Sequence, residues 1–329
     1  MIMIDLTGTN SVPDGGTVVA MGLFDGLHYG HRTVIRYAAD IAGRTTGAEP
    51  AVFTFDTASV TSKGRGGVDY ILSRDMKFEL LEGLGVKYVY SPDFANFKDL
   101  DGDGFVQLVL CDKFNAKCAV CGEDFRFGRG AKWGVKELDG LCRKHGIKLY
   151  SVPKVTENFG ERISSTMIRG LIREGNIERA NLLMGSGFAL KLPVAYGRKL
   201  GRTLDFPTIN QYFPKRQIVP KYGVYASRTE VCGGIYKSVT NIGVKPTVGS
   251  DAPLAETYII DYSGEELYGE TAKVTLTAFL RPERKFADVD ELKARIAADV
   301  EKARTVPDKI RLLCEIDGKD TPENENERT

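Results

Sequence analysis

The sequence predicts an α/β domain built on a parallel sheet, followed by a small antiparallel β-barrel and a C-terminal helix. Strand-like apolar runs alternate with helical periodicity in the first half of the chain, as in parallel α/β sheets. The second half contains short runs rich in Val, Ile, Tyr and Thr, separated by Gly and Pro. A length of 329 residues suits two domains better than one.

Five segments of the first half are strand-like, and the first of them is typical of a buried parallel strand. They are residues 17–21, 51–55, 87–90, 116–121 and 148–152. Apolar side chains at helical spacing predict a helix over residues 32–42, after the first strand. Ser73 has the side chain of an N-cap and predicts another helix through Leu84. This alternation predicts helices on both faces of the sheet.

The second half predicts an antiparallel barrel with strands at residues 222–226, 257–260 and 273–277. The Cys-Gly-Gly sequence at residues 232–234 is typical of a hairpin turn. A helix is expected over about residues 289–303, because apolar side chains recur there on one helical face.

The change of pattern near residues 184–187 marks the domain boundary. We place the α/β domain at residues 1–185 and the barrel domain, with its helix, at residues 186–314. Residues 315–329 are acidic and polar, and we expect them to be a disordered tail.

The composition is that of a soluble globular protein, with 42% hydrophobic and 27% charged residues. A net charge of +1 gives no overall basic field, so we expect no nucleic-acid partner. No apolar run approaches the roughly 18 residues of a membrane span, and residues 1–10 do not resemble a signal peptide. The six scattered cysteines are therefore expected to be reduced thiols in the cytoplasm.

A glycine-rich segment, residues 22–31, joins the first strand to the first helix and contains two of the three histidines of the chain. Ligands bind at such junctions in open α/β sheets. Glycine allows close approach to the backbone, and a helix N-terminus offers unpaired N–H groups to phosphate. His28 and His31 are each able to donate a hydrogen bond to a triphosphate.

The sequence of this segment, GLFDGLHYGH, resembles the HxGH signature of the nucleotidyltransferase superfamily. Its form is that of the prokaryotic bifunctional riboflavin kinase/FAD synthetases. The motifs GEDFRFG at residues 122–128 and ISSTMIR at residues 163–169 continue the resemblance. The resemblance implies a Rossmann-like nucleotidyltransferase domain that adenylylates FMN with ATP. Positioning and charge neutralisation supply most of the catalysis of such an in-line transfer.

The resemblance also implies which residues carry this reaction. His28 and His31 are expected to be catalytic and to hold the ATP phosphates. Asp124 and Phe125 are expected to contact the flavin. The remaining ATP contacts are expected from Gly22, Phe24, Asp25, Gly30, Ser164, Ser165, Thr166 and Arg169. Independently of the resemblance, the Ser-Ser-Thr run has the side chains of a helix N-cap.

One segment departs from the family pattern. The family places Pro-His-Pro after the second strand, whereas this chain has Thr57-Ala58-Ser59. Thr57 and Ser59 are able to hydrogen-bond a nucleotide but carry no positive charge. This leaves open a second hypothesis, a monofunctional riboflavin kinase with an impaired adenylyltransferase half.

The barrel half carries a resemblance of its own. The sequence FPTIN at residues 206–210 resembles the Pro-Thr-Ala-Asn signature of flavokinases. NIGVKPT at residues 241–247, Glu256 in a strand and RPERKF at residues 281–286 continue that pattern. The two resemblances cover nearly the whole chain, and their pairing is itself a mark of the bifunctional family. The second one implies phosphorylation of riboflavin to FMN with ATP.

Glu256 matches the catalytic glutamate of the flavokinases, the general base for the ribityl hydroxyl. Thr208 and Asn210 offer hard oxygen ligands to Mg²⁺, and Thr208 is also expected to contact phosphate. Arg281 and Phe286 are expected to contact the flavin. The basic, glycine-rich loop before this motif is expected to bind ATP through Gly197, Lys199, Gly201 and Arg202.

Asp205 stands where the flavokinases have Gly. A carboxylate near phosphate is expected to weaken ATP binding unless a basic side chain or Mg²⁺ offsets it. The expected small-molecule partners are ATP, riboflavin, FMN and FAD. A third hypothesis is a flavin-sensing or flavin-storing protein that binds these molecules and catalyses neither reaction.

Overall fold

The computed structural model describes residues 1–4, 12–56, 69–156, 161–196, 206–244 and 252–307. The chain divides into two compact units, residues 1–169 with 214–218 and residues 170–213 with 219–329. Some sequence predictions lie outside the described residues and stay predictions. They concern Thr57 to Ser59, Gly197, Lys199, Gly201, Arg202, Asp205, residues 245–247 and the tail 315–329.

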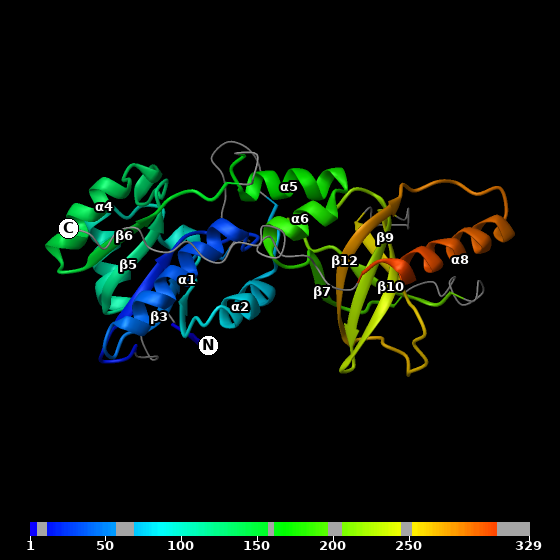
Figure 1. The fold of residues 1–329 in the computed structure, drawn as a ribbon, viewed down its shortest axis with the longest axis horizontal. Helices are drawn as coiled ribbons and strands as arrows, with labels where there is room; N and C mark the ends of the chain where they lie inside the picture. Colours follow the sequence, from blue (N-terminus) through cyan, green and yellow to red (C-terminus); the bar gives the residue numbers. More distant parts are fainter. Residues whose placement is uncertain (5–11, 57–68, 157–160, 197–205, 245–251, 308–329) are drawn as a thin grey trace. The chain divides into compact units, whose positions relative to one another are not determined.

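The first unit is built on a six-stranded sheet (Figure 1). Its strands are β1 (Ile2–Met3), β2 (Thr17–Met21), β3 (Glu49–Phe53), β4 (Tyr88–Tyr90), β5 (Ala116–Gly122) and β6 (Lys148–Val152). The order is β1-β4-β3-β2-β5-β6, and all neighbouring pairs are parallel. The five predicted strands are confirmed. The sequence did not predict β1, which is too short to show a period.

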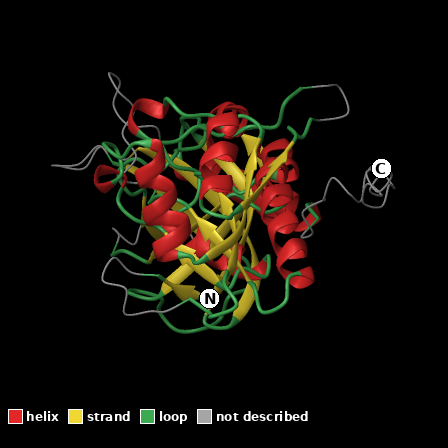
Figure 2. Ribbon diagram, turned by 90° about the vertical axis from the view of Figure 1, so that its left-hand side faces the viewer, coloured by secondary structure: helices red, strands yellow, loops and turns green. Residues whose placement is uncertain are grey.

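Both faces of this sheet are covered by helices, as the sequence predicts (Figure 2). All five residues of β2 are buried, which is typical of a strand covered on two sides. On one face α1 (Tyr29–Arg44) packs on β2 and β3. The core of the other face joins the sheet to the π-helical segment η2 (Val106–Lys113) and to α4 (Val135–Lys144).

The remaining helical segments of this part of the chain are short. They are α2 (Arg74–Gly83), η1 (Phe94–Asn96), α3 (Gly102–Phe105), η3 (Arg129–Ala131) and α5 (Ser165–Glu174). The predicted cap of α2 is confirmed, because the Ser73 hydroxyl accepts a hydrogen bond from the Met76 N–H at 3.4 Å. Helix α1 begins at Tyr29, three residues earlier than predicted, so the second histidine of the 22–31 segment lies in its first turn.

The strand order reverses beside β2. The chain passes from β2 outward to β3 and β4 on one side, and then to β5 and β6 on the other. The carboxyl ends of β2 and β5 therefore flank the crevice where open α/β sheets bind their ligands. Residues 22–31 follow the first of these strands, and residues 123–131 follow the second.

The second unit contains six antiparallel strands in the order β7-β12-β9-β10-β11-β8. They are β7 (Ala189–Pro193), β8 (Thr208–Tyr212), β9 (Gly223–Val231), β10 (Gly234–Val244), β11 (Pro253–Ile259) and β12 (Thr271–Arg281). A bridge from Ala195 to Asn210 links the two edges, so the sheet is a nearly closed barrel. The predicted hairpin turn is confirmed between β9 and β10, where Cys232 and Gly233 have φ angles of 49° and 76°.

Among the residues that the structure describes, the helices α6 (Ile177–Met184) and α8 (Val289–Thr305) accompany the barrel. The C-terminal helix α8, orange to red in Figure 1, confirms the predicted helix and extends it by two residues. It packs on β9 and β10 through a small core that includes Val224, Ala226, Val300 and Ala303.

A chain of buried hydroxyl groups crosses the strands β9, β10 and β11. Ser227 bonds to Ser238 at 2.7 Å and to Thr240 at 2.8 Å. Thr240 in turn bonds to Thr257 at 2.8 Å. Each such bond contributes about 1 kcal/mol net to stability. A shifted strand register would leave these buried hydroxyls unpaired and would therefore be less stable. The chain of hydroxyl groups thus fixes the register that places the neighbouring Glu256.

Candidate functional site

The segment between β2 and α1 has an unusual backbone conformation. Phe24 and Leu27 have φ angles of 50° and 41°, which non-glycine residues seldom adopt. Both side chains are fully buried, so packing holds the strained backbone in place. Gly26 has a φ of 82°, and a Cβ atom there would lie 2.9 Å from Ile71 Cδ1. Glycine is therefore required at position 26 both for its backbone angle and for space.

Asp25 is buried and fixes this segment to two other parts of the unit. Its Oδ1 accepts a hydrogen bond from the Ile71 backbone N–H at 2.9 Å, and its Oδ2 pairs with the Arg169 guanidinium. Arg169 also donates to the Asp69 carbonyl at 2.8 Å. The Ser165 hydroxyl donates to the Asp25 carbonyl at 2.7 Å. The first turns of α5 are thereby joined to the histidine segment, residues 22–31.

His28 and His31 lie at the start of α1 with stacked rings, 3.7 Å between centroids and 21° between planes. Burial lowers the pKa of His28 to about 4, and the charges of Arg162 and Arg169 act in the same direction. Burial likewise lowers the pKa of His31 well below its ordinary value, with His28 and nearby cations adding to the effect. Both imidazoles are therefore neutral at pH 7 and act as hydrogen-bonding groups. Within the described residues, neither Nδ1 atom has a hydrogen-bond partner.

A cavity of about 810 Å³ lies beside the two histidines, where β2 and β5 end. Its wall carries an excess of positive charge. The acidic residues are Asp99, Glu123 and Asp124, and the basic residues are Lys98, Arg126, Arg129, Lys154 and Arg162. Arg162 pairs with Asp124, and the Lys154 ammonium lies 3.4 Å from Glu123. The excess of cations next to unpaired imidazole nitrogens suits a polyphosphate.

Another part of the same wall is aromatic. It contains Phe53, Phe55, Phe94, Phe97, Phe105, Phe125 and Phe127. The rings of Phe125 and Phe127 are nearly parallel, with 13° between planes and 5.9 Å between centroids. Flat apolar faces of this kind bind a fused heterocyclic ring by stacking and by burial of apolar area. One cavity therefore combines a phosphate-binding region with a ring-binding region.

Nine of the residues predicted from the sequence line this cavity. They are Gly22, Phe24, His28, Gly30, His31, Asp124, Phe125, Ser164 and Ser165. Three predicted residues do not line it, because Asp25 and Arg169 bind each other in a buried pair and Thr166 is exposed on α5. The phenylalanine wall was not predicted from the sequence. Its signal was present in the alternating phenylalanines of FTF at residues 53–55, where β3 ends, and of FRF at residues 125–127, in the loop after β5.

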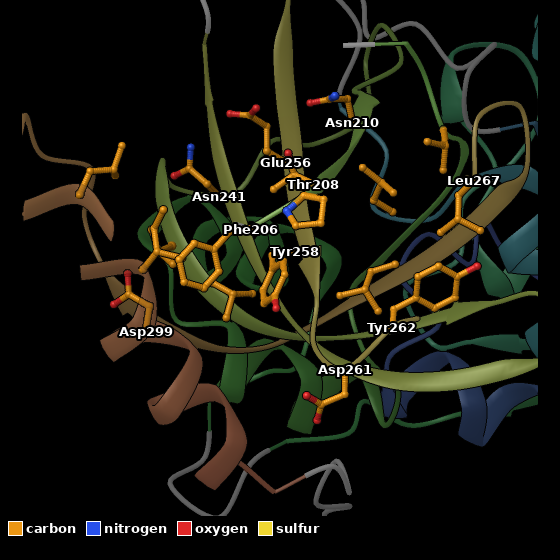
Figure 3. Close-up of a pocket in the computed structure, with 18 of the residues that line it drawn as sticks. Phe206, Thr208, Asn210, Asn241, Glu256, Tyr258, Asp261, Tyr262, Leu267 and Asp299 are labelled. Atoms are coloured by element: carbon orange, nitrogen blue, oxygen red, sulfur yellow. The ribbon is translucent and has the colours of Figure 1, made fainter. Parts of the chain in front are cut away.

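A second cavity, of about 820 Å³, lies in the barrel unit. Glu256 on β11 is the register partner of both Asn210 on β8 and Asn241 on β10. Directly opposed residues of antiparallel strands share a face, so the three side chains form a row. Thr208 lies two residues before Asn210 and faces the same way. Figure 3 shows these four side chains at one end of the cavity.

The cavity continues over an apolar floor. Phe206 and Tyr258 meet edge to face, with 5.2 Å between ring centroids and 83° between planes. Leu292 and Ile296 of α8 also line it, so helix and sheet together enclose the space. The polar row of Thr208, Asn210, Asn241 and Glu256 thus lies beside the rings of Phe206 and Tyr258, whereas the carboxylates of Asp261 and Asp299 lie elsewhere on the wall (Figure 3).

An ion pair joins the end of β12 to α8. Arg281 donates to the Asp299 carboxylate at 2.8 Å, and Asp299 is 1% exposed. Phe286 lies beneath two guanidinium groups, at 5.6 Å from Arg281 and 4.7 Å from Arg284. These contacts place Arg281 and Phe286, both predicted flavin contacts, on the wall of the cavity.

A second carboxylate, which sequence analysis gave no role, stands near Glu256. The Asn241 amide donates to Glu283 at 3.4 Å. A Cβ atom at Gly243 would lie 2.1 Å from the same Glu283 oxygen. The lack of a side chain at position 243 therefore leaves room for Glu283 on this cavity wall.

The described residues contain no group of three or more His, Cys, Asp or Glu side chains that would hold a metal ion by themselves. Thr208 and Asn210 nevertheless line the cavity beside Glu256 and offer a hydroxyl and an amide oxygen. Mg²⁺ prefers such hard oxygens and commonly takes most of its remaining ligands from substrate phosphates and water. The donor set therefore fits a magnesium ion that binds together with a nucleotide.

All of the predicted kinase-site residues that the structure describes line one cavity. They are Thr208, Asn210, Glu256, Arg281 and Phe286. The predicted phosphate loop, with Gly197, Lys199, Gly201 and Arg202, lies outside the described residues.

Comparison with known proteins extends over both units. A family model described as FAD synthetase matches residues 11–167, and one described as riboflavin kinase matches residues 184–306. The bifunctional riboflavin kinase/FMN adenylyltransferase of Listeria monocytogenes is 35% identical over 302 residues, which are 90% of this chain and 94% of that protein. The same enzyme of Bacillus subtilis is 36% identical over 294 residues, covering 87% and 91% of the two chains. The Escherichia coli enzyme is 34% identical over 300 residues, covering 90% and 94%.

One solved structure is similar over nearly the whole chain. It is described as a macrolide-efflux protein from Streptococcus pneumoniae, and it superposes with a TM-score of 0.81 at 29% identity. The match covers 93% of this chain and 99% of that one. In the described part of the present chain, none of the helices has the length and hydropathy of a membrane span.

Proposed function

The chain belongs to the bifunctional riboflavin kinase/FMN adenylyltransferase family, and from this premise we propose how its residues divide the two reactions. The enzyme phosphorylates riboflavin to FMN and adenylylates FMN to FAD, with ATP as the donor in both steps. We assign adenylyl transfer to the α/β domain, residues 1–185, and phosphorylation to the barrel domain, residues 186–314. The observation that supports this division is a separate cavity in each unit, each with polar groups for phosphate beside an apolar surface for a flat ring.

In the α/β domain, the ATP phosphates bind beside His28 and His31. An FMN phosphate oxygen attacks the α-phosphorus of ATP, the bond to the bridging oxygen breaks, and pyrophosphate leaves. The neutral imidazoles donate hydrogen bonds to the phosphates, and basic side chains such as Arg162 neutralise the charge of the transition state. Ser164 and Ser165, at the N-terminus of α5, add donors near the leaving group.

The flavin ring of FMN lies on the phenylalanine wall, with Asp124 and Phe125 among its contacts. The glycines at positions 22 and 30 leave the backbone open to the nucleotide. Asp25 and Arg169 act indirectly in this proposal, because their buried ion pair joins the histidine segment to helix α5. Thr57 and Ser59 supply hydroxyl groups where related enzymes have a histidine.

In the barrel domain, Glu256 is the general base. It accepts the proton of the ribityl 5′-hydroxyl while that oxygen attacks the γ-phosphorus, and ADP leaves. Arg281 and Phe286 contact the flavin, and the loop with Gly197, Lys199, Gly201 and Arg202 wraps the ATP phosphates. Thr208 and Asn210 are the residues that would hold Mg²⁺, which would supply positive charge to neutralise the ATP phosphates.

A single assay tests the assignment of both activities. The protein is incubated with riboflavin, ATP and Mg²⁺, and the flavins are separated by chromatography. We expect FMN and then FAD. Accumulation of FMN alone would mean that the Thr57–Ser59 segment has lost adenylyl transfer, and unchanged riboflavin would mean a flavin-binding protein without either activity. We place the enzyme in the cytoplasm, where ATP is available and its cysteines stay reduced.

A further inference from the structure

Lys77 on α2 is a buried cation, with a side chain that is 1% exposed. Its ammonium donates to the Phe55 carbonyl at 2.9 Å, to the Thr54 hydroxyl at 3.3 Å and to the Leu23 carbonyl at 3.5 Å. These acceptors are two carbonyls and a hydroxyl rather than a carboxylate. A buried ammonium is costly unless hydrogen bonds compensate the lost water, so a lysine here calls for a reason beyond packing.

The three acceptors belong to the two segments that leave β2 and β3. Leu23 lies at the start of the histidine segment, and Thr54 and Phe55 follow β3. The Thr54 hydroxyl donates to the Leu23 carbonyl at 2.8 Å, so this carbonyl receives bonds from both Thr54 and Lys77. One ammonium thus ties the histidine segment to the two residues that follow β3, of which Phe55 lines the cavity.

The charge of Lys77 also acts on His31. Burial lowers the pKa of Lys77 to about 8, and the nearby Asp25 and Asp56 oppose this effect while Arg74 adds to it. The side chain is therefore mostly charged at pH 7. Its charge is one of the causes that lower the pKa of His31. Lys77 does not itself line the cavity, so it acts there through its neighbours.

We propose that Lys77 is a positioning residue for FMN adenylylation, whose ammonium holds the Leu23 carbonyl and the end of β3 so that the His28–His31 pair faces the nucleotide. The inference rests on the function proposed for this cavity. A positioning role explains why a cation is kept out of reach of the substrate yet bonded to both segments that shape its pocket. Small misplacements of reacting groups cost roughly 10²-fold in rate.

The test compares Lys77→Met with Arg74→Met. The first removes the buried ammonium and keeps the length of the side chain, and the second removes an exposed cation from the same helix. For Lys77→Met we expect kcat of FMN adenylylation to fall about 10- to 100-fold, with a much smaller change in KM for ATP. Riboflavin phosphorylation by the same preparation should be unchanged. Arg74→Met should retain wild-type kcat for both reactions.

The fluorescence of Trp133, the single tryptophan of the chain, reports whether the first unit is folded. If Lys77→Met does not fold, Thr54→Val tests the same link, because it removes the hydroxyl that bridges Lys77 and Leu23. We then expect a loss of kcat of several-fold with KM for ATP retained. The proposal is overturned if a folded Lys77→Met variant, or Thr54→Val, retains the wild-type kcat. It is also overturned if either variant changes only KM.

His31→Asn separates this inference from the proposed function on which it rests. If His31→Asn leaves FMN adenylylation intact, the assignment of the cavity itself is wrong. If His31→Asn abolishes the reaction while Lys77→Met leaves kcat unchanged, the cavity assignment stands and only the role of Lys77 fails.

Discussion

Asn210 and Glu256 are direct register partners across β8 and β11, so their side chains lie on one face of the barrel sheet. Thr208 shares this face, and Asn241 continues the row on β10. The register thus brings the proposed general base next to the proposed magnesium ligands, although they lie far apart in the sequence. A shift of one residue in β11 would turn Glu256 to the opposite face.

Glu256→Gln is expected to lower kcat of riboflavin phosphorylation by about 10²- to 10⁴-fold, the usual contribution of a general base. Conversion of supplied FMN to FAD should be unchanged, because that reaction uses the other cavity. Chromatography of the flavins, with riboflavin and FMN as separate substrates, measures both rates. Glu301→Gln neutralises an exposed carboxylate on α8 and serves as the control. An equal loss of both reactions in a folded variant would contradict the assignment of separate sites.

Arg169→Met is expected to destabilise the first unit by about 3–5 kcal/mol, because it leaves the Asp25 carboxylate buried without its partner. The double variant Asp25→Asn/Arg169→Met should lose less than the sum of the two single changes. Urea unfolding followed by the fluorescence of Trp133 measures each free energy of unfolding. Unchanged stability in Arg169→Met would instead favour a direct contact of this side chain with phosphate.

The low pKa values of the stacked histidines predict a pH-dependent stability. Burial lowers the pKa of His28 to about 4, whereas the unfolded chain titrates near its ordinary value of 6.5. Between these two values the unfolded chain binds a proton that the folded protein excludes, so the free energy of unfolding falls as the pH falls from about 6.5. His31 acts in the same direction. Unfolding at pH 7 and pH 5 should show this loss in the wild type, and His28→Asn should reduce it.

Gly243→Ala is expected to lower riboflavin phosphorylation more than it lowers stability. The new Cβ atom would lie 2.1 Å from Glu283 and would force that side chain away from Asn241. The backbone itself needs no change, because only the end of a flexible side chain has to move. Steady-state kinetics for riboflavin and thermal unfolding test the two parts of this prediction. Wild-type kinetics would show that Glu283 has no part in shaping the kinase cavity.

Much of the fold followed from local patterns in the sequence. Apolar runs in the sequence indicate the buried strands of the first unit. The glycine at position 233 indicates the hairpin turn that it forms with Cys232. Motifs predicted Thr208, Asn210 and Glu256 as residues of the proposed kinase site, and the register of β8 and β11 brings them together. Motifs are able to predict such a grouping because they mark residues that occupy fixed places on their strands.

Other features depend on tertiary contacts that no local pattern contains. Asp25 and Arg169 lie in motifs that were predicted to bind phosphate. In the structure these two side chains, 144 positions apart in the sequence, bind each other instead of lining the cavity. The apolar spacing of α2 does not predict that the Lys77 ammonium is buried. The acceptors of this ammonium come from the segments after two different strands, which the helix sequence does not contain. The phenylalanine wall is likewise assembled from several segments, of which only two show a pattern of their own.

The central claim is that each unit contains a complete and independent site, and a mixing experiment tests it most directly. Glu256→Gln and His31→Asn are each incubated alone with riboflavin, ATP and Mg²⁺, and then together in equal amounts. Alone, we expect the first variant to leave riboflavin unchanged and the second to stop at FMN. Together they should produce FAD, because FMN released by one variant is adenylylated by the other. A mixture that yields no FAD from two folded variants would contradict the division of the two reactions between the two cavities.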